Sequence, residues 1–290
     1  MTLYDATLGP FAEFGFMRRA LVGCLALALG CGPIGTILVI RRMSLMGDAL
    51  SHAVLPGAAL GFIFAGLSLP AMSFGGLVAG LVVALLSGLV TRLTPLREDA
   101  SFAAFYLMSL ALGVLLVSTH GNNVDLLHLL FGSILAVDNA ALILIGAIAT
   151  LSLLLLAVIY RPLVVECFDP GFLRAVGGRG GLVHTLFLAL VVLNLVAGFQ
   201  ALGTLMAVGL MMLPAAAARF WVRELWSLCA ASSVLALASG LLGLLLSYHL
   251  GIPSGPAIVL VAGLVYLASV IFGPRDSLSA LYVRRAHLEA

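Results

Sequence analysis

Hydrophobic residues form long, nearly uninterrupted blocks along this chain, separated by short polar or glycine- and proline-containing connections. Each block is roughly 20 residues long, the length at which an α-helix crosses the hydrocarbon core of a bilayer. The pattern therefore predicts an all-α, polytopic transmembrane bundle with about nine spans. The predicted spans cover residues 20–40, 46–67, 71–92, 101–119, 140–160, 182–199, 201–218, 225–247 and 255–273.

The remaining segments are expected to complete one transmembrane permease domain over residues 1–290. Residues 1–19 lack the features of a cleavable signal, and we expect them to form an amphipathic segment at the membrane surface. Residues 124–137 are apolar but short for a crossing, which indicates a surface or re-entrant helix. The stretches 161–181 and 274–290 are expected to be an inner loop and a C-terminal tail.

The composition agrees with a membrane protein. Hydrophobic residues make up 63% of the chain and charged residues 9%, whereas a soluble domain is about half apolar and about a quarter charged. All the basic residues other than histidine are arginines. Without a lysine the chain cannot contain a G-x-x-x-x-G-K-[ST] phosphate-binding loop, so we expect any ATP hydrolysis to occur on a separate subunit.

The arginines predict the orientation. All except Arg18 and Arg19 follow an odd-numbered predicted span and therefore share one side of the membrane, which the positive-inside rule assigns to the cytoplasm. This places the C-terminus inside and the N-terminus outside. The arginines on the predicted inner side are Arg41, Arg42, Arg92, Arg97, Arg161, Arg174, Arg179, Arg219, Arg223, Arg275, Arg284 and Arg285.

Asp48 and His52 are the strongest candidates for metal ligands. They stand four residues apart near the start of the second predicted span, so a helix would place them on one face. A carboxylate within a span costs about 2.5–3.5 kcal/mol on insertion scales, and a carboxylate with an imidazole suits zinc, manganese or iron. In the alternative interpretation, Asp48 caps the helix after Gly47 and His52 bonds to a neighbouring carbonyl group.

Prolines predict two helix breaks. Pro56 and Gly57 follow His52 by about one turn, and Pro214 lies inside the seventh predicted span. A broken helix in lipid is tolerated only where protein or a water-filled cavity satisfies the freed backbone groups. Broken helices beside an ionisable residue are typical of transport sites.

Three motifs resemble one protein family. R-R-M-x-L-x-G-D-A-x-S-H-x-x-L-P-G, from Arg41 to Gly57, is similar to the signature of the permease subunits of zinc, manganese and iron ABC importers. GTLMAVGLMMLPAAAA (203–218) resembles that family's second hallmark. FDPGFLRAVGG (168–178) resembles its cytoplasmic coupling segment, with Gly171 where an acidic residue is usual.

The resemblance implies a fold like that of the vitamin B12 and siderophore importer permeases. It also implies a permease dimer, with two identical chains or a close paralogue, two copies of a cytoplasmic ATPase and an external metal-binding receptor. The ion would be cargo, with no resident cofactor, and would cross the bacterial inner membrane by alternating access. Apart from these proteins we expect contact with lipid and none with nucleic acid. The implied coupling residues are Phe168, Asp169, Pro170, Arg174 and Gly177.

A second group of possible ligands lies on the predicted outer side. His120, Asp125 and His128 fall within nine residues of one another. They are expected to pass the metal from the receptor to the pore, to dock the receptor, or to be polar residues at headgroup level.

Two other functions were weighed against the importer. An ATP-independent secondary transporter or channel usually needs several intramembrane acids for its ion relay, and Asp48 is the only acid well inside a predicted span. An intramembrane metalloprotease would need an H-E-x-x-H helix, which the sequence lacks. Both are therefore disfavoured.

Overall fold

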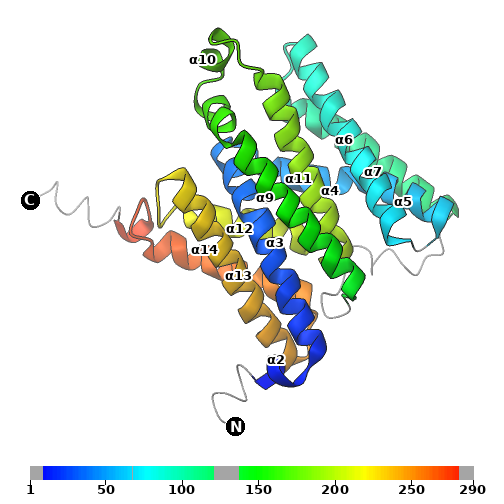
Figure 1. Cartoon of the computed structure of the whole chain (residues 1–290), viewed down its shortest axis with the longest axis vertical. Helices are drawn as coiled ribbons and strands as arrows, with labels where there is room; N and C mark the ends of the chain where they lie inside the picture. Colours follow the sequence, from blue (N-terminus) through cyan, green and yellow to red (C-terminus); the bar gives the residue numbers. More distant parts are fainter. Residues whose placement is uncertain (1–8, 67, 121–136, 281–290) are drawn as a thin grey trace, which may run out of the picture.

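The computed structural model describes residues 9–66, 68–120 and 137–280, and within these ranges the regular structure is helical. Within these ranges, eight spans are long and apolar enough to cross a membrane, which confirms the predicted polytopic all-α bundle (Figure 1). Their helices are α3 (Gly15–Ile40), α4 (Ser44–Ala53) together with α5 (Leu55–Ala65), α6 (Leu69–Leu93), α7 (Glu98–His120), α9 (Asn139–Phe168), α11 (Gly180–Leu202), α13 (Leu225–Leu250) and α14 (Ser254–Phe272).

Three short helices complete the described part of the chain. They are α2 (Gly9–Glu13), α10 (Pro170–Ala175) and α12 (Thr204–Ala218). Helix α12 matches the seventh predicted span, but its 15 residues extend only about 22 Å, less than the thickness of a bilayer core. In Figure 1, α10 and α2 lie at opposite ends of the bundle.

Two expected boundaries are corrected by the structure. Helix α3 begins at Gly15, so the end of the expected N-terminal segment 1–19 belongs to the first span. Helix α9 continues to Phe168, so the expected inner loop 161–181 is largely helical. Both differences have one cause. Polar residues at the end of an apolar block, such as Arg18 or Glu166, do not interrupt the helical backbone hydrogen bonds, so the helix is longer than the block. The expected outer helix lies almost entirely outside the described residues.

Helix α3 is the centre of the bundle. It packs against α9, α11, α12 and α13, and Figure 1 shows it in the middle of the molecule. Small residues allow these close approaches: a Cβ atom at Gly35 would overlap the carbonyl group of Met211 on α12. In lipid, where burial of apolar surface gives no driving force, such close packing holds helices together.

Helices α4 to α7 form a second group beside α11 (Figure 1). The tightest contact in this group is between α5 and α6, where a Cβ atom at Gly57 would overlap the carbonyl group of Gly75. Helix α4 packs against α6, α7, α11 and α12. It therefore joins the two groups of helices, and it carries Asp48 and His52.

The Gly57–Gly75 contact predicts a large effect of a single methyl group. Gly57→Ala should lower the free energy of unfolding by about 1–3 kcal/mol, because the α5 and α6 backbones would have to separate. The thermal midpoint of the detergent-purified protein measures this. The matched control is Gly146→Ala on α9, where an added Cβ meets nothing within 4 Å; it should leave the midpoint unchanged or raise it. Equal midpoints for the two variants would contradict the packing argument.

Candidate metal site

A tight turn fixes the start of α4. Helix α3 ends in a Schellman motif, in which the amide of Met43 donates to the carbonyl of Leu38 at 2.9 Å and that of Arg42 to Val39 at 3.2 Å. The residue that must be left-handed in this motif is usually glycine, but here it is Arg42, with φ 59°. The hydrogen bonds outweigh the local strain and set the direction in which α4 leaves α3.

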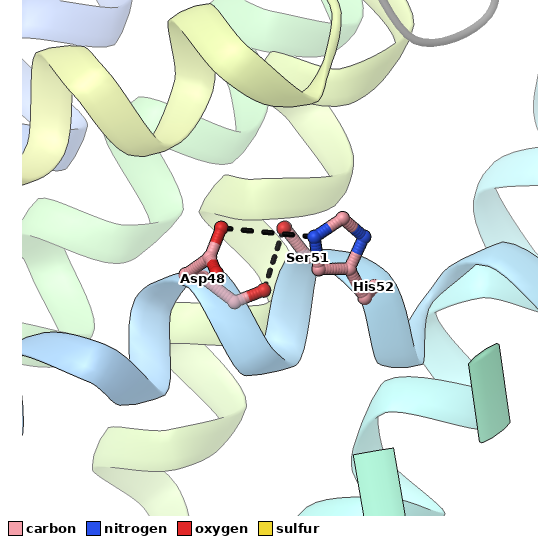
Figure 2. Close-up of polar contacts among 3 residues, drawn as sticks. All are labelled: Asp48, Ser51 and His52. Carbon is pink, nitrogen blue, oxygen red and sulfur yellow. Dashed lines mark hydrogen bonds and ion pairs between the residues drawn. The ribbon is translucent and has the colours of Figure 1, made fainter. Parts of the chain in front are cut away.

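Helix α4 places Asp48 and His52 on one face, as the spacing predicted. The Oδ1 atom of Asp48 lies 3.8 Å from Nε2 of His52, and Figure 2 shows both side chains rising from the same side of the helix. The hydroxyl group of Ser51, between them, donates to the backbone carbonyl of Asp48 at 2.7 Å and is thus occupied within the helix. A carboxylate and an imidazole at this separation can share one metal ion.

The capping alternative does not fit the structure. The helix begins at Ser44 with Met43 in the cap position, so Asp48 lies a full turn inside the helix. The Nδ1 atom of His52 is buried and has no hydrogen-bond partner among the described residues, so it does not bond to a neighbouring carbonyl. The nitrogen of His52 that faces Asp48 is the other one, Nε2, so Nε2 and the Asp48 carboxylate are the atoms that could share an ion.

One chain supplies only part of a coordination shell. The Asp48 side chain is 66% exposed and that of His52 30%, although both lie on a span. In the described part of the chain no three His, Cys, Asp or Glu side chains come together as a metal site. The pair is therefore open at the surface of the single chain, where additional ligands can approach.

The helix is interrupted next to this pair for a single residue, Val54, which itself keeps helical dihedral angles (φ −72°, ψ −27°). Helix α4 ends at Ala53 and α5 begins at Leu55, so the break lies at Val54, just before Pro56 and Gly57. Because Pro56 has no amide hydrogen, it cannot continue the hydrogen-bond ladder to His52. On the neighbouring α7, Ser109 donates to the carbonyl oxygen of Ala53 at 3.0 Å. This hydrogen bond ties α7 to the end of α4, one residue after the carbonyl group of His52 that Pro56 leaves without a helical donor.

The expected break at Pro214 is wrong. Helix α12 runs without interruption through Pro214, and the chain instead reverses at Gly203, between α11 and α12, where φ is 81°. Glycine tolerates this left-handed conformation, whereas a proline can remain inside a helix whose neighbours pack around it. Met211 and Met212 of α12 lie over Gly47, next to Asp48, so this helix still borders the pair.

The expected coupling residues lie around α10. Asp169 accepts a hydrogen bond from the amide of Phe172 at 2.8 Å and so caps this helix, which begins at Pro170 and contains Arg174. Gly177, with φ 78°, lies in the turn that follows it. Large apolar side chains are exposed at intervals of four residues: Phe168 at 68%, Phe172 at 57% and Val176 at 69%.

The expected outer-mouth site stays a prediction. His120 is the last residue of α7, and Asp125 and His128 lie outside the described residues. A contact that the sequence did not reveal occurs at the α10 end of the bundle, where Arg41 bonds to residues of α9 and α11. The sequence identified Arg41 only as an orienting charge, because residues far apart in the chain meet there.

Together, the apolar spans of the described residues define a multi-pass membrane protein, with the Asp48–His52 pair as its candidate metal site. The chain belongs to the ABC 3 transport family, whose profile matches residues 13–273. This confirms the resemblance carried by the three motifs.

Relatives cover nearly the whole chain. The manganese import system permease protein ScaB of Streptococcus parasanguinis is 35% identical over 91% of this chain and 93% of its own length. The manganese transport system membrane protein MntC of Listeria innocua is 32% identical over 92% of this chain and 94% of its own.

A solved structure of PsaBC from Streptococcus pneumoniae in complex with Fab matches with a TM-score of 0.85 and 31% identity, over 97% of this chain and 100% of the other. A transporter of the metal-chelate ABC type in an inward-facing conformation shares the fold, with a TM-score of 0.71 at 18% identity.

The left-handed residue of the α3–α4 turn gives a stability prediction. Arg42→Gly should raise the free energy of unfolding by about 1 kcal/mol, because glycine adopts this conformation without steric cost. Arg42→Val should lower it, since a β-branched residue is strained there. Thermal midpoints of the purified variants provide the comparison. A destabilised Arg42→Gly variant would mean that the arginine side chain, and not the turn, dominates this position.

Proposed function

We propose that this chain is the permease subunit of an ATP-driven importer that carries manganese, or another divalent transition metal of the same ligand preference such as zinc or iron, into the cytoplasm. The observation that carries the proposal is the Asp48–His52 pair beside a helix break, with one imidazole nitrogen buried and unpartnered. Family membership supports an ABC transporter, and the manganese relatives favour manganese.

A second permease copy explains the open side of the pair. Asp48 would be a costly lipid-facing charge if its exposed surface remained in the bilayer, and a neighbouring subunit removes that cost. In a two-fold dimer each copy would contribute its own carboxylate and imidazole. Four donors would then hold an ion between the chains, and separation of the chains would release it.

The exposed apolar residues around α10 fit an ATPase docking surface. Phe168, Phe172 and Val176 lie at the end of the bundle, where α10 projects beyond the spans (Figure 1). Apolar anchors on a short helix suit a groove on a soluble partner. Two ATPase copies, one for each permease, would pull on these helices. An external receptor would deliver the ion to the opposite end.

This arrangement assigns the α10 end to the cytoplasm of a bacterial cell. The arginines at this end, Arg41 and Arg179 among them, agree with the positive-inside rule. The described N-terminal helix α2 would then lie outside. Alternating access would open the ligand pair first to the receptor side and then to the ATPase side.

The proposal predicts that the ligand pair is needed for transport. In cells that contain the ATPase and the receptor, Asp48→Ala and His52→Ala should each lower uptake of radiolabelled manganese at least about tenfold, since each removes a metal ligand. Uptake of zinc and iron is measured in parallel. Permease levels in the membrane are matched by immunoblot.

Ser51→Ala is the control on the same face of the helix. Its hydroxyl group is bonded to the backbone, so this variant should transport normally. Normal uptake by both ligand variants would show that the pair is structural. A wild type that moves none of the three metals would refute the substrate class.

The docking surface gives a separate prediction. Phe168→Ser combined with Phe172→Ser should abolish co-purification of the ATPase with the permease and stop uptake, because both changes remove apolar anchors. The control is Leu278→Ser, which alters an exposed apolar residue outside α10. This variant should retain both the co-purification of the ATPase and the uptake of metal. Retention of the ATPase by the double variant would place the docking surface elsewhere.

A further inference from the structure

Arg41 holds together the ends of three helices. It occupies the cap position at the end of α3, and its Nε atom donates to Sγ of Cys167 at 3.1 Å. Its Nη1 atom lies 2.6 Å from Nδ1 of His184. Because a guanidinium group has only donors, the imidazole nitrogen accepts this hydrogen bond. The guanidinium carbon also lies 5.4 Å from the centre of the Phe187 ring, within cation–π range.

The two hydrogen-bond partners flank α10. Cys167 is next to the last residue of α9, and His184 lies in the first turns of α11. The chain between them contains α10 and little else. A displacement of α10 therefore acts first on the two helix ends that Arg41 contacts.

The ends of α9 and α11 are themselves in close contact. A Cβ atom at Gly180, the first residue of α11, would overlap the carboxylate of Glu166 on α9. A negative charge beside the N-terminus of a helix is favourable. The end of α9 and the start of α11 therefore lie against each other at the two ends of the α10 segment. Arg41 contacts both of these helix ends.

Along the chain, Arg41 is connected to the Asp48–His52 pair by a short turn. The Schellman turn begins at Arg41, and α4, with Asp48 and His52, starts at Ser44. The turn is hydrogen-bonded throughout and contains no glycine, so it transmits a displacement without absorbing it. No other described arginine bonds both to α9 and to α11.

From these contacts we infer that Arg41 is a positioning residue that joins the α10 segment to the metal-binding helix α4. Movement of α10 shifts the Cys167–Arg41–His184 bridge, and the turn carries this shift to Asp48 and His52. The inference rests on the proposed function and adds a transmission role for a residue that belongs neither to the Asp48–His52 pair nor to α10. Lysine cannot replace arginine here. The guanidinium group has separate N–H donors for Cys167 and for His184, whereas a single ammonium group cannot reach both.

The test measures coupling in the whole transporter. Permease, ATPase and receptor are reconstituted in proteoliposomes, and manganese uptake and ATP hydrolysis are measured in the same vesicles, which gives the number of ions moved per ATP. Arg41→Ala and Arg41→Lys should lower this ratio at least about tenfold while ATP hydrolysis continues, because charge-assisted hydrogen bonds are lost. A merely structural role would reduce the amount of assembled complex and leave the ratio unchanged.

Control variants distinguish the loss of the Cys167–Arg41–His184 contacts from the loss of one positive charge. Arg42→Asn removes the same charge one residue away, tolerates the left-handed conformation without introducing a glycine into the turn, and should keep the wild-type ratio. His184→Ala should lower the ratio, and combining it with Arg41→Ala should add little, since both changes break one bridge. Fully additive effects, or an equal loss in Arg42→Asn, would overturn the inference.

The experiment distinguishes three outcomes: a variant that does not assemble, a wrong inference about Arg41, and a wrong proposed function. If Arg41→Ala does not assemble, Cys167→Ala and His184→Ala each remove one contact and leave the charge in place; an unchanged ratio in both overturns the inference. A wild type that transports manganese while all bridge variants remain coupled refutes the bridge alone. A wild type that moves neither manganese, zinc nor iron refutes the proposed function, and the inference with it.

Discussion

Lipid supplies no hydrogen bonds, so each polar group within a span must find its partner inside the protein. Most of the polar groups described in this bundle obey the constraint locally. Ser109 satisfies the carbonyl of Ala53 beside the helix break, and Asn194 donates to Ser152 at 2.6 Å in the core. Asp48 and His52 are exceptions, because the Asp48 carboxylate is exposed and Nδ1 of His52, like side-chain oxygens of Ser87, Glu166 and Ser254, is buried without a partner among the described residues. A pair that the protein leaves incomplete in lipid requires either a ligand or a neighbouring subunit.

The same constraint explains why much of the fold could be predicted from the sequence. The spans are the only way to place such long apolar blocks in a bilayer, and the Asp48–His52 pair follows from helical spacing alone. Pro214 shows where local rules fail. A proline has a fixed local effect, but packing around α12 decides whether the helix stops, and here it continues to Ala218. The Arg41 contacts could not be predicted either, since Cys167 and His184 are more than a hundred residues away in the chain.

Tight contacts on both sides of the ligand pair limit how it can move. On one side, the hydrogen-bonded turn at Arg42 fixes α4 to α3. On the other, the Gly57–Gly75 contact fixes α5 to α6 with no room for a methyl group. Between them lies Val54, where the ladder is interrupted by Pro56. Any change in the direction of α4 relative to α5 must therefore be taken up at Val54, one turn or less from His52.

This geometry places the ligands close to the weakest point of their own span. In the proposed dimer, a small rotation of α4 near such a point would change the separation of the carboxylate and imidazole from the ligands of the second subunit, and metal affinity depends steeply on that separation. Strong binding would require all donors to be held rigidly, as in a structural zinc site with four ligands. Here two donors per chain stand on a helix whose direction is set by a turn at one end and a break at the other. In the proposed importer, capture and release of an ion would then follow from repacking of nearly rigid helices, without unfolding of any span.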